Sequence, residues 1–336
     1  EIEIKGDSIM MQTPVFEGYL AGTFTENTIE GQFVKESLDR IVPFKAVYGI
    51  EERFKTTSEN LNKNISGIWE TYFSPNLEEE YIGKGIFLQE NDKVTGTFRT
   101  TTGDYRFLEG VVDGDSLKLS AFDGAHAFLF NAKITDSTMN GVFYSGNHFK
   151  ELFVATRNDG FELPDPDSLT FLNEGYDKLA FTFPDTEGKM ISLSDEKYKD
   201  KTVIVQLLGT WCPNCLDETK FLVDYLKDNS DIEVIGLAFE SAKTKDIAIK
   251  GIKRLKDRVG VTYPILLAQY GTYDKQKAQE KLPMLNHVLS YPTTIFIDKK
   301  GKVRKIHTGF NGPATGDKYE EFKTDFNQLI TKLQNE

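Results

Sequence analysis

The period of the hydrophobic pattern changes once along this chain, and the change separates two regions of different fold class. Before residue 157, aromatic and aliphatic residues alternate with polar ones in short runs that end in Asn, Asp or Gly turns. Such alternation is typical of half-buried antiparallel strands joined by hairpins. Beyond residue 177, continuous apolar runs alternate with segments of helical period, which indicates an α/β layer.

The length of 336 residues also favours two domains, because it exceeds the size at which one hydrophobic core keeps growing. Between the two patterns, Pro164 and Pro166 lie among aspartates, and proline cannot donate to a strand ladder. We therefore expect an all-β domain at residues 1–157, a linker at 158–176, and an α/β domain at 177–336.

The first region repeats the motif Gly-x-Phe at residues 31–33, 96–98 and 141–143. We expect its strands to form an antiparallel meander closed into a barrel or a sandwich, since open sheet edges invite aggregation. A short helical turn is expected near Ser58–Leu61. The alternate aromatic residues predict a packed interior, with a ligand cavity as the alternative. Nothing in this region indicates catalytic chemistry.

The second region predicts strands and helices in alternation. Expected strands are residues 202–208, 232–239, 293–298 and 302–309, after a hairpin at 181–193. Expected helices are residues 212–227, 243–259 and 317–334.

The chain has two cysteines, Cys212 and Cys215, which follow the buried strand 202–208. A structural zinc site needs four ligands, and the four histidines are scattered without a short-range pair, so we expect no metal. A disulfide that closes so short a loop removes little chain entropy and would stabilise the fold little. Redox chemistry is the interpretation that remains.

The expected position of Cys212 at the start of a helix explains how this chemistry would work. Unpaired backbone N–H groups and the positive end of the helix dipole favour the thiolate form of its sulfur. Pro213 then occupies the first helical position, where a missing N–H does no harm. Cys215 lies one turn further on the same face, is expected to be more buried, and would resolve the mixed disulfide.

Composition restricts the partners and the compartment. The net charge of −12 argues against nucleic acid, and no apolar run is long enough to span a bilayer. A single close cysteine pair suits an oxidising compartment, although a cysteine-poor cytosolic protein is the alternative. The sequence begins at Glu1 without a methionine or a signal-peptide pattern, which fits either a processed or a trimmed chain.

Two motifs, "GTWCPNC" at residues 209–215 and "YPTTIFID" at 291–298, lie in the predicted order of strands and helices. Together they resemble the thioredoxin fold and, more narrowly, the extracytoplasmic TlpA/ResA-like thiol–disulfide oxidoreductases. The resemblance covers residues 177–336. It implies a reductase without a cofactor, in which Cys212 attacks a disulfide of a partner protein and Cys215 resolves it.

The same resemblance implies further partners and a location. A membrane thiol donor upstream would reduce the cysteine pair again. The location would be periplasmic or otherwise extracytoplasmic, and a lipid anchor or membrane tether outside the printed residues would be compatible with it. Maturation of c-type cytochromes is one role in the family, but no residue here specifies it.

The resemblance to TlpA/ResA-like proteins also implies roles for individual residues. Pro292 would be cis and lie beside the cysteine pair, and Tyr291 would offer a backbone edge to an extended substrate segment. Trp211 would cover the Cys212 sulfur and, with Pro213, belong to the docking face; simple packing is the alternative for the tryptophan.

Two features depart from thioredoxins proper. Gln206 stands where they have a buried aspartate, and the family glutamate at the end of the next strand corresponds to Glu240. Glu240 is expected to have a raised pKa and to relay a proton to or from Cys215, with a solvated strand-end acid as the alternative. The segment 269–290 before the cis-proline motif is longer than expected and could reshape the substrate groove.

The sequence is also compatible with two other functions. A peroxiredoxin-like peroxidase shares the fold but needs a Thr or Ser three residues before the reactive cysteine, where this chain has Gly209. Alternatively, the chain is a binding protein whose β domain carries the main function.

Overall fold

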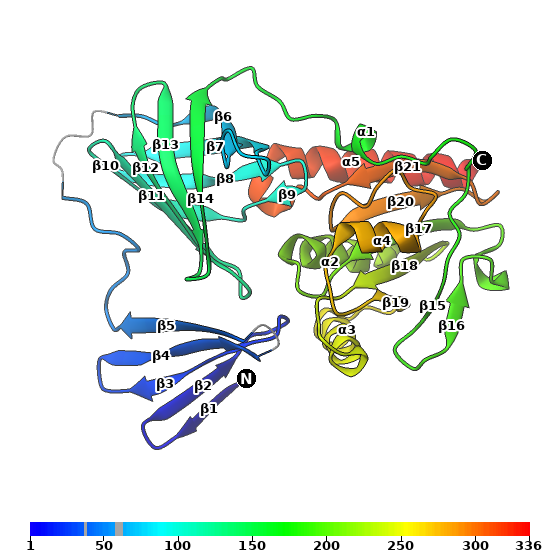
Figure 1. Ribbon diagram of the computed structural model, residues 1–336, viewed down its shortest axis with the longest axis horizontal. Helices are drawn as coiled ribbons and strands as arrows, with labels where there is room; N and C mark the ends of the chain where they lie inside the picture. The colour runs from blue at the N-terminus through cyan, green and yellow to red at the C-terminus, as the bar shows by residue number, and fades with distance from the viewer. Residues whose placement is uncertain (37–38, 58–62) are drawn as a thin grey trace. The chain divides into compact units, whose positions relative to one another are not determined.

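A computed structural model describes residues 1–336 except 37–38 and 58–62 (Figure 1), so the turn expected near Ser58–Leu61 lies outside the described residues. The chain divides into two compact units. The first comprises Glu1–Thr100 and Asp104–Leu163, and the second comprises Thr101–Gly103 and Pro164–Glu336.

The first unit contains two antiparallel sheets rather than one. The five strands of the first sheet pair in chain order: β1 (Ile2–Lys5), β2 (Ser8–Gln12), β3 (Tyr19–Phe24), β4 (Thr28–Lys35) and β5 (Arg40–Val47). The expectation of a single meander over residues 1–157 was therefore wrong for these strands. The later strands close on themselves, which leaves them no free edge for β5 to join.

Eight of the later strands form a closed barrel, as expected. They are β6 (Gly67–Phe73), β7 (Tyr81–Glu90), β8 (Lys93–Thr100), β10 (Leu108–Asp113), β11 (Ser116–Phe122), β12 (Ala127–Ile134), β13 (Thr138–Ser145) and β14 (Phe149–Arg157). The pairs β14–β6 and β10–β8 close the ring, and the short β9 (Gly103–Asp104) follows β8.

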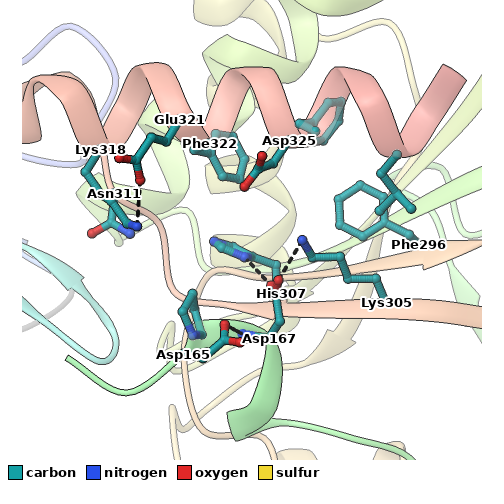
Figure 2. A pocket seen from close by; sticks show the side chains of 13 residues that line it. Asp165, Asp167, Phe296, Lys305, His307, Asn311, Lys318, Glu321, Phe322 and Asp325 are labelled. Atoms are coloured by element: carbon teal, nitrogen blue, oxygen red, sulfur yellow. Dashed lines mark hydrogen bonds and ion pairs between the residues drawn. The ribbon is translucent and has the colours of Figure 1, made fainter. Parts of the chain in front are cut away.

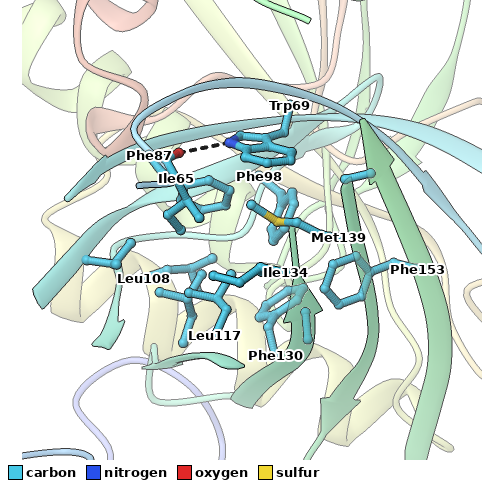
Figure 3. Close-up of a cluster of buried hydrophobic side chains, with 14 of the residues drawn as sticks. Ile65, Trp69, Phe87, Phe98, Leu108, Leu117, Phe130, Ile134, Met139 and Phe153 are labelled. Carbon is cyan, nitrogen blue, oxygen red and sulfur yellow. Dashed lines mark hydrogen bonds between the residues drawn. The ribbon is translucent and has the colours of Figure 1, made fainter. Parts of the chain in front are cut away.

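Aromatic side chains fill the barrel interior (Figure 3). Phe130 stacks on Phe143 with ring centroids 4.5 Å apart, and the Trp69 indole N–H donates to the Ile65 carbonyl over 2.8 Å. The glycine of one Gly-x-Phe motif follows from this packing, because a Cβ on Gly141 would lie 2.5 Å from the Phe153 ring. The alternate aromatic residues therefore form a packed core.

The second unit contains a five-stranded mixed sheet in the order β19-β18-β17-β20-β21. Its strands are β17 (Thr202–Leu208), β18 (Ile232–Phe239), β19 (Ile265–Gln269), β20 (Thr293–Ile297) and β21 (Val303–Thr308), preceded by the hairpin of β15 (Thr182–Pro184) and β16 (Met190–Ser192). Its helices are α1 (Pro166–Leu169), α2 (Pro213–Asp228), α3 (Lys245–Val259), α4 (Lys275–Lys281) and α5 (Asp317–Asn335), and its 3₁₀ turns are η2 (Glu196–Tyr198) and η3 (Pro313–Thr315).

Every residue of β17 is buried, as its continuous apolar run predicts. Figure 1 shows the longer helices packed about the sheet, and α2 contacts α5 through Phe221 and Phe326, whose ring centroids are 4.9 Å apart. Over the described part of the chain, no helix has the length and apolar character needed to cross a bilayer.

The strand directions bring the two motifs of the sequence to one edge of the sheet. β17 is parallel to β18 and antiparallel to β20. The residues after β17 and β18 therefore lie at the same edge as the residues before β20. This edge gathers the cysteine pair, Glu240 and the Tyr291–Pro292 peptide.

Candidate active site

Cys212 is the N-cap residue of α2, with extended backbone angles. Its sulfur accepts a hydrogen bond from the Cys215 backbone N–H over 3.2 Å and lies 3.4 Å from the Tyr291 carbonyl oxygen, to which the thiol donates. The Tyr291–Pro292 peptide bond is cis, as the resemblance implies. The sulfur therefore lies at the amino end of α2, within contact of a backbone N–H group that has no partner inside the helix.

Both cysteines are free thiols, but Cys215 is the more enclosed of the two. Cys212 is 7% exposed and Cys215 is 1% exposed. Burial raises the pKa of the Cys215 thiol well above its ordinary value, and the hydrogen bond and charge of Cys212 raise it further. Cys215 is therefore a neutral thiol at neutral pH, and its attack on a mixed disulfide requires a proton acceptor.

A buried carboxylate that the sequence did not predict as a site residue, Glu218, lies on the same helix. One of its oxygens accepts from Gln206 Nε2 over 2.8 Å, and the other accepts from Thr294 Oγ1 over 2.6 Å. Gln206 in turn accepts from Thr219 and donates weakly to the Cys215 carbonyl over 3.5 Å. Gln206 therefore links Glu218 to the backbone of Cys215 within a buried hydrogen-bond network.

The charge state of Glu218 is set by its surroundings. Burial raises its pKa to about 7, while the hydrogen bonds from Thr294 and Gln206 act in the opposite direction. Glu218 also contributes to the raised pKa of Cys215. A carboxyl group with this pKa can take up or release a proton near neutral pH. The sequence did contain a signal for Glu218. It is a glutamate on the same face of the helix as Cys215 and Leu222, which are both buried.

Glu240 lies directly after β18, and its side chain is turned toward the segment that precedes the cysteine pair. It accepts from the Thr210 backbone N–H over 2.8 Å and from Thr210 Oγ1 over 2.7 Å. Burial raises its pKa to about 7, as expected from the sequence. These contacts fix the backbone two residues before Cys212, and proton relay to Cys215 stays a prediction.

The remaining site residues surround the Cys212 sulfur. The Trp211 indole N–H donates to the Phe239 carbonyl over 3.0 Å, and its ring meets the Tyr291 ring edge-on at 5.9 Å. Pro213 is the first residue of α2, where the missing N–H costs no hydrogen bond. The structure therefore brings Trp211, Pro213, Tyr291 and Pro292 around the cysteine pair, while their part in substrate binding stays a prediction.

A separate cavity of about 100 Å³ lies between α1, β21 and α5 (Figure 2). In it, Asp167 accepts from His307 Nδ1 over 2.7 Å and pairs with Lys305 over 2.6 Å. Neither cysteine lines this cavity. These contacts attach the linker segment to the sheet, and the candidate redox chemistry lies elsewhere.

The buried carboxyl groups predict a pH dependence of stability. In the unfolded chain Glu218 ionises near 4.5, whereas in the folded protein its pKa is about 7. Stability is therefore fully present below pH 4.5 and falls as the pH rises to 7, by on the order of 3 kcal/mol for this group. Glu218→Gln should accordingly gain free energy of unfolding, relative to the unmodified protein, between pH 5 and pH 8.

Urea unfolding at both pH values measures this difference. The matched control is Glu187→Gln, which changes an exposed glutamate and should shift little. An equal change for both variants would contradict the prediction.

Comparisons with known proteins agree with this geometry. The Redoxin family model matches residues 175–322. Thiol-disulfide oxidoreductase ResA of Bacillus subtilis is 31% identical over 142 residues, which are 41% of this chain and 69% of that protein. Thioredoxin-like protein YneN of the same organism is 29% identical over 139 residues, covering 41% of this chain and 73% of that protein. The crystal structure of a thiol:disulfide interchange protein from Chlorobium tepidum is 19% identical and covers 48% of this chain and 98% of that one, with a TM-score of 0.36.

Proposed function

Since the chain belongs to the ResA family of thiol–disulfide oxidoreductases, we propose that it is an extracytoplasmic reductase of protein disulfides. The observation that carries the proposal is the contact geometry of the Cys212 sulfur. It lies at the start of α2, within hydrogen-bond distance of a backbone N–H and beside the cis Tyr291–Pro292 peptide. An extended substrate segment can meet the sulfur at that backbone edge.

The reaction has two exchange steps. The Cys212 thiolate attacks one sulfur of the substrate disulfide, the S–S bond breaks, and the released substrate thiolate takes up a proton. Cys215 then loses its proton and attacks the Cys212 sulfur of the mixed disulfide. The second substrate thiol leaves. The substrate has then gained two electrons, and Cys212 and Cys215 are joined in a disulfide. An upstream dithiol donor, which we place at a membrane, reduces this pair again.

The buried acids supply the proton transfer in the second step. We assign the role of proton acceptor for Cys215 to Glu218, because its charge acts on that thiol and its pKa of about 7 matches neutral conditions. Glu240 keeps the preceding segment in place through Thr210, and the proton relay predicted for it is the alternative to Glu218. The single cysteine pair supports the extracytoplasmic location, since further thiols would risk mispairing there.

The first unit contributes a surface in this proposal rather than a ligand cavity, because aromatic rings fill its barrel. We keep residues 1–157, 158–176 and 177–336 as the proposed β domain, linker and redox domain. A pull-down with residues 1–157 that captured a small ligand, together with full biological activity of Cys212→Ser, would favour a binding protein instead.

The direction of electron transfer shows whether the protein reduces or oxidises its substrates. The reduced protein should reduce a protein disulfide such as that of insulin faster than its dithiol reductant does alone. A redox titration against glutathione should give a more reducing potential than the glutathione couple. Net oxidation of substrate thiols would overturn the reductase assignment. Rapid consumption of peroxide would instead support the peroxidase, for which Gly209 lacks the required hydroxyl group.

Substitution of the acids separates their roles. Glu218→Gln should slow resolution of the mixed disulfide at pH 7 by roughly 10²-fold, because general base catalysis is lost. Resolution of preformed mixed disulfide, followed by the release of substrate thiol between pH 5 and 9, measures this rate. Glu240→Gln, which changes a similar buried acid, tests the alternative relay and should slow resolution less. A larger loss for Glu240→Gln would move the proton relay to that residue.

A further inference from the structure

The loop between β19 and α4, residues 270–274, is held firmly to the rest of the second unit. The Gln269 side-chain amide donates to the Thr272 carbonyl over 2.9 Å, and the Gly271 N–H donates to the Ala242 carbonyl over 2.8 Å. The Asp274 carboxylate caps α4 by accepting from the Gln276 N–H over 2.8 Å. The loop therefore presents its side chains in a defined arrangement.

One of these side chains, Tyr273, lies beside the residue that precedes the reactive cysteine. The Tyr273 and Trp211 ring centroids are 5.9 Å apart, with an angle of 52° between the rings. Trp211 is itself fixed by its hydrogen bond to the Phe239 carbonyl and by the Tyr291 ring. Tyr273 is nevertheless 63% exposed, so most of its side chain is not packed in the core.

The residue that begins α4 places the same loop close to the reacting sulfur. Burial lowers the pKa of Lys275, and the Cys212 sulfur acts on it in the opposite direction. Lys275 therefore lies close enough to Cys212 to interact with the charge of its sulfur. Tyr273 and Trp211, which we call the aromatic pair, therefore lie beside the residue that a substrate disulfide must reach.

Resting on the reductase function proposed above, we propose that Tyr273 is a specificity-determining residue. The aromatic pair receives a large apolar or aromatic side chain that lies next to the disulfide cysteine of the partner protein. An exposed tyrosine supplies wide contact area at low conformational cost, and such residues dominate recognition at protein interfaces. The segment 269–290, whose length was unexpected, reshapes the substrate groove through this one side chain.

The experiment compares two peptides that differ only beside their disulfide cysteine, one with phenylalanine and one with glycine. The unmodified protein should reduce the phenylalanine peptide with a kcat/KM about three- to tenfold higher, mainly through a lower KM. Tyr273→Ala should abolish that preference, whereas Tyr273→Phe should keep it. The reduction of a small disulfide, bis(2-hydroxyethyl) disulfide, should be unchanged in both variants, because it carries no large side chain for Tyr273 to contact.

The matched control is Tyr270→Ala, which removes an exposed tyrosine of the same loop that is 49% exposed. It should leave the peptide preference intact. An unmodified protein that reduces both peptides equally well, or a Tyr273→Ala variant that loses activity on the small disulfide too, would overturn the specificity role. An unmodified protein that reduces none of the three substrates would overturn the proposed function itself.

Discussion

Replacement of Cys212 by serine is expected to abolish disulfide exchange, lowering the rate by roughly 10³-fold or more, because no other group can supply the nucleophile. The sequence contains no third cysteine that could take its place. Reduction of insulin by the variant should fall to the rate of the dithiol reductant alone.

Replacement of Cys215 by alanine should give a different defect. The Cys212 sulfur keeps its contact with the backbone N–H of residue 215, since alanine retains that group. Attack therefore proceeds, but resolution does not, and covalent mixed disulfides with substrates accumulate.

Non-reducing electrophoresis and mass spectrometry would show these adducts and identify the partners. Cys212→Ser with Cys215→Ala is the control and should trap nothing. Adducts formed by Cys212→Ser alone would show that the roles of the two cysteines are reversed.

The second large effect is expected in the barrel core. Phe73→Ala should lower the free energy of unfolding of the first unit by about 3–5 kcal/mol. The Phe73 side chain is fully buried, and its ring lies 4.8 Å from the Tyr81 ring and 5.5 Å from the Phe98 ring. Its removal would leave a cavity within a rigid cluster of rings that cannot collapse around it.

The two tryptophans allow this to be measured selectively. Trp69 lies in the barrel core, so a Trp211→Phe background makes its fluorescence report on the first unit alone. Phe107→Ala is the matched control, because that ring is 63% exposed. It should cost less than about 1 kcal/mol. Equal losses for the two variants would contradict a packed barrel interior.

The pattern of residues was sufficient to predict the class of each region and the central elements of the site. A continuous apolar run followed by two cysteines implied a buried strand that leads into a helix. The structure has this strand as β17, and Cys212 is the N-cap of the helix that follows. Local rules decide such features, because capping, periodicity and the lack of a proline N–H act within a few residues.

The separate sheet of the first five strands and the role of Glu218 could not be predicted in the same way. Strand period shows which face of a strand is apolar, but not which strand pairs with it, and the β14–β6 and β10–β8 pairs excluded the early strands. For Glu218, the helix showed an acid on an inward face, but its partners Gln206 and Thr294 lie on two other strands.

The amino-acid sequence by itself determined that this protein has a β region, an α/β region and one dithiol at the start of a helix. Only the tertiary structure decided that the buried Glu218 is held by Gln206 and Thr294 and that the Tyr273 ring lies against Trp211. The physical reason is distance along the chain. Hydrophobic period and helix capping act between near neighbours, whereas burial and the resulting pKa shifts depend on residues that only folding brings together.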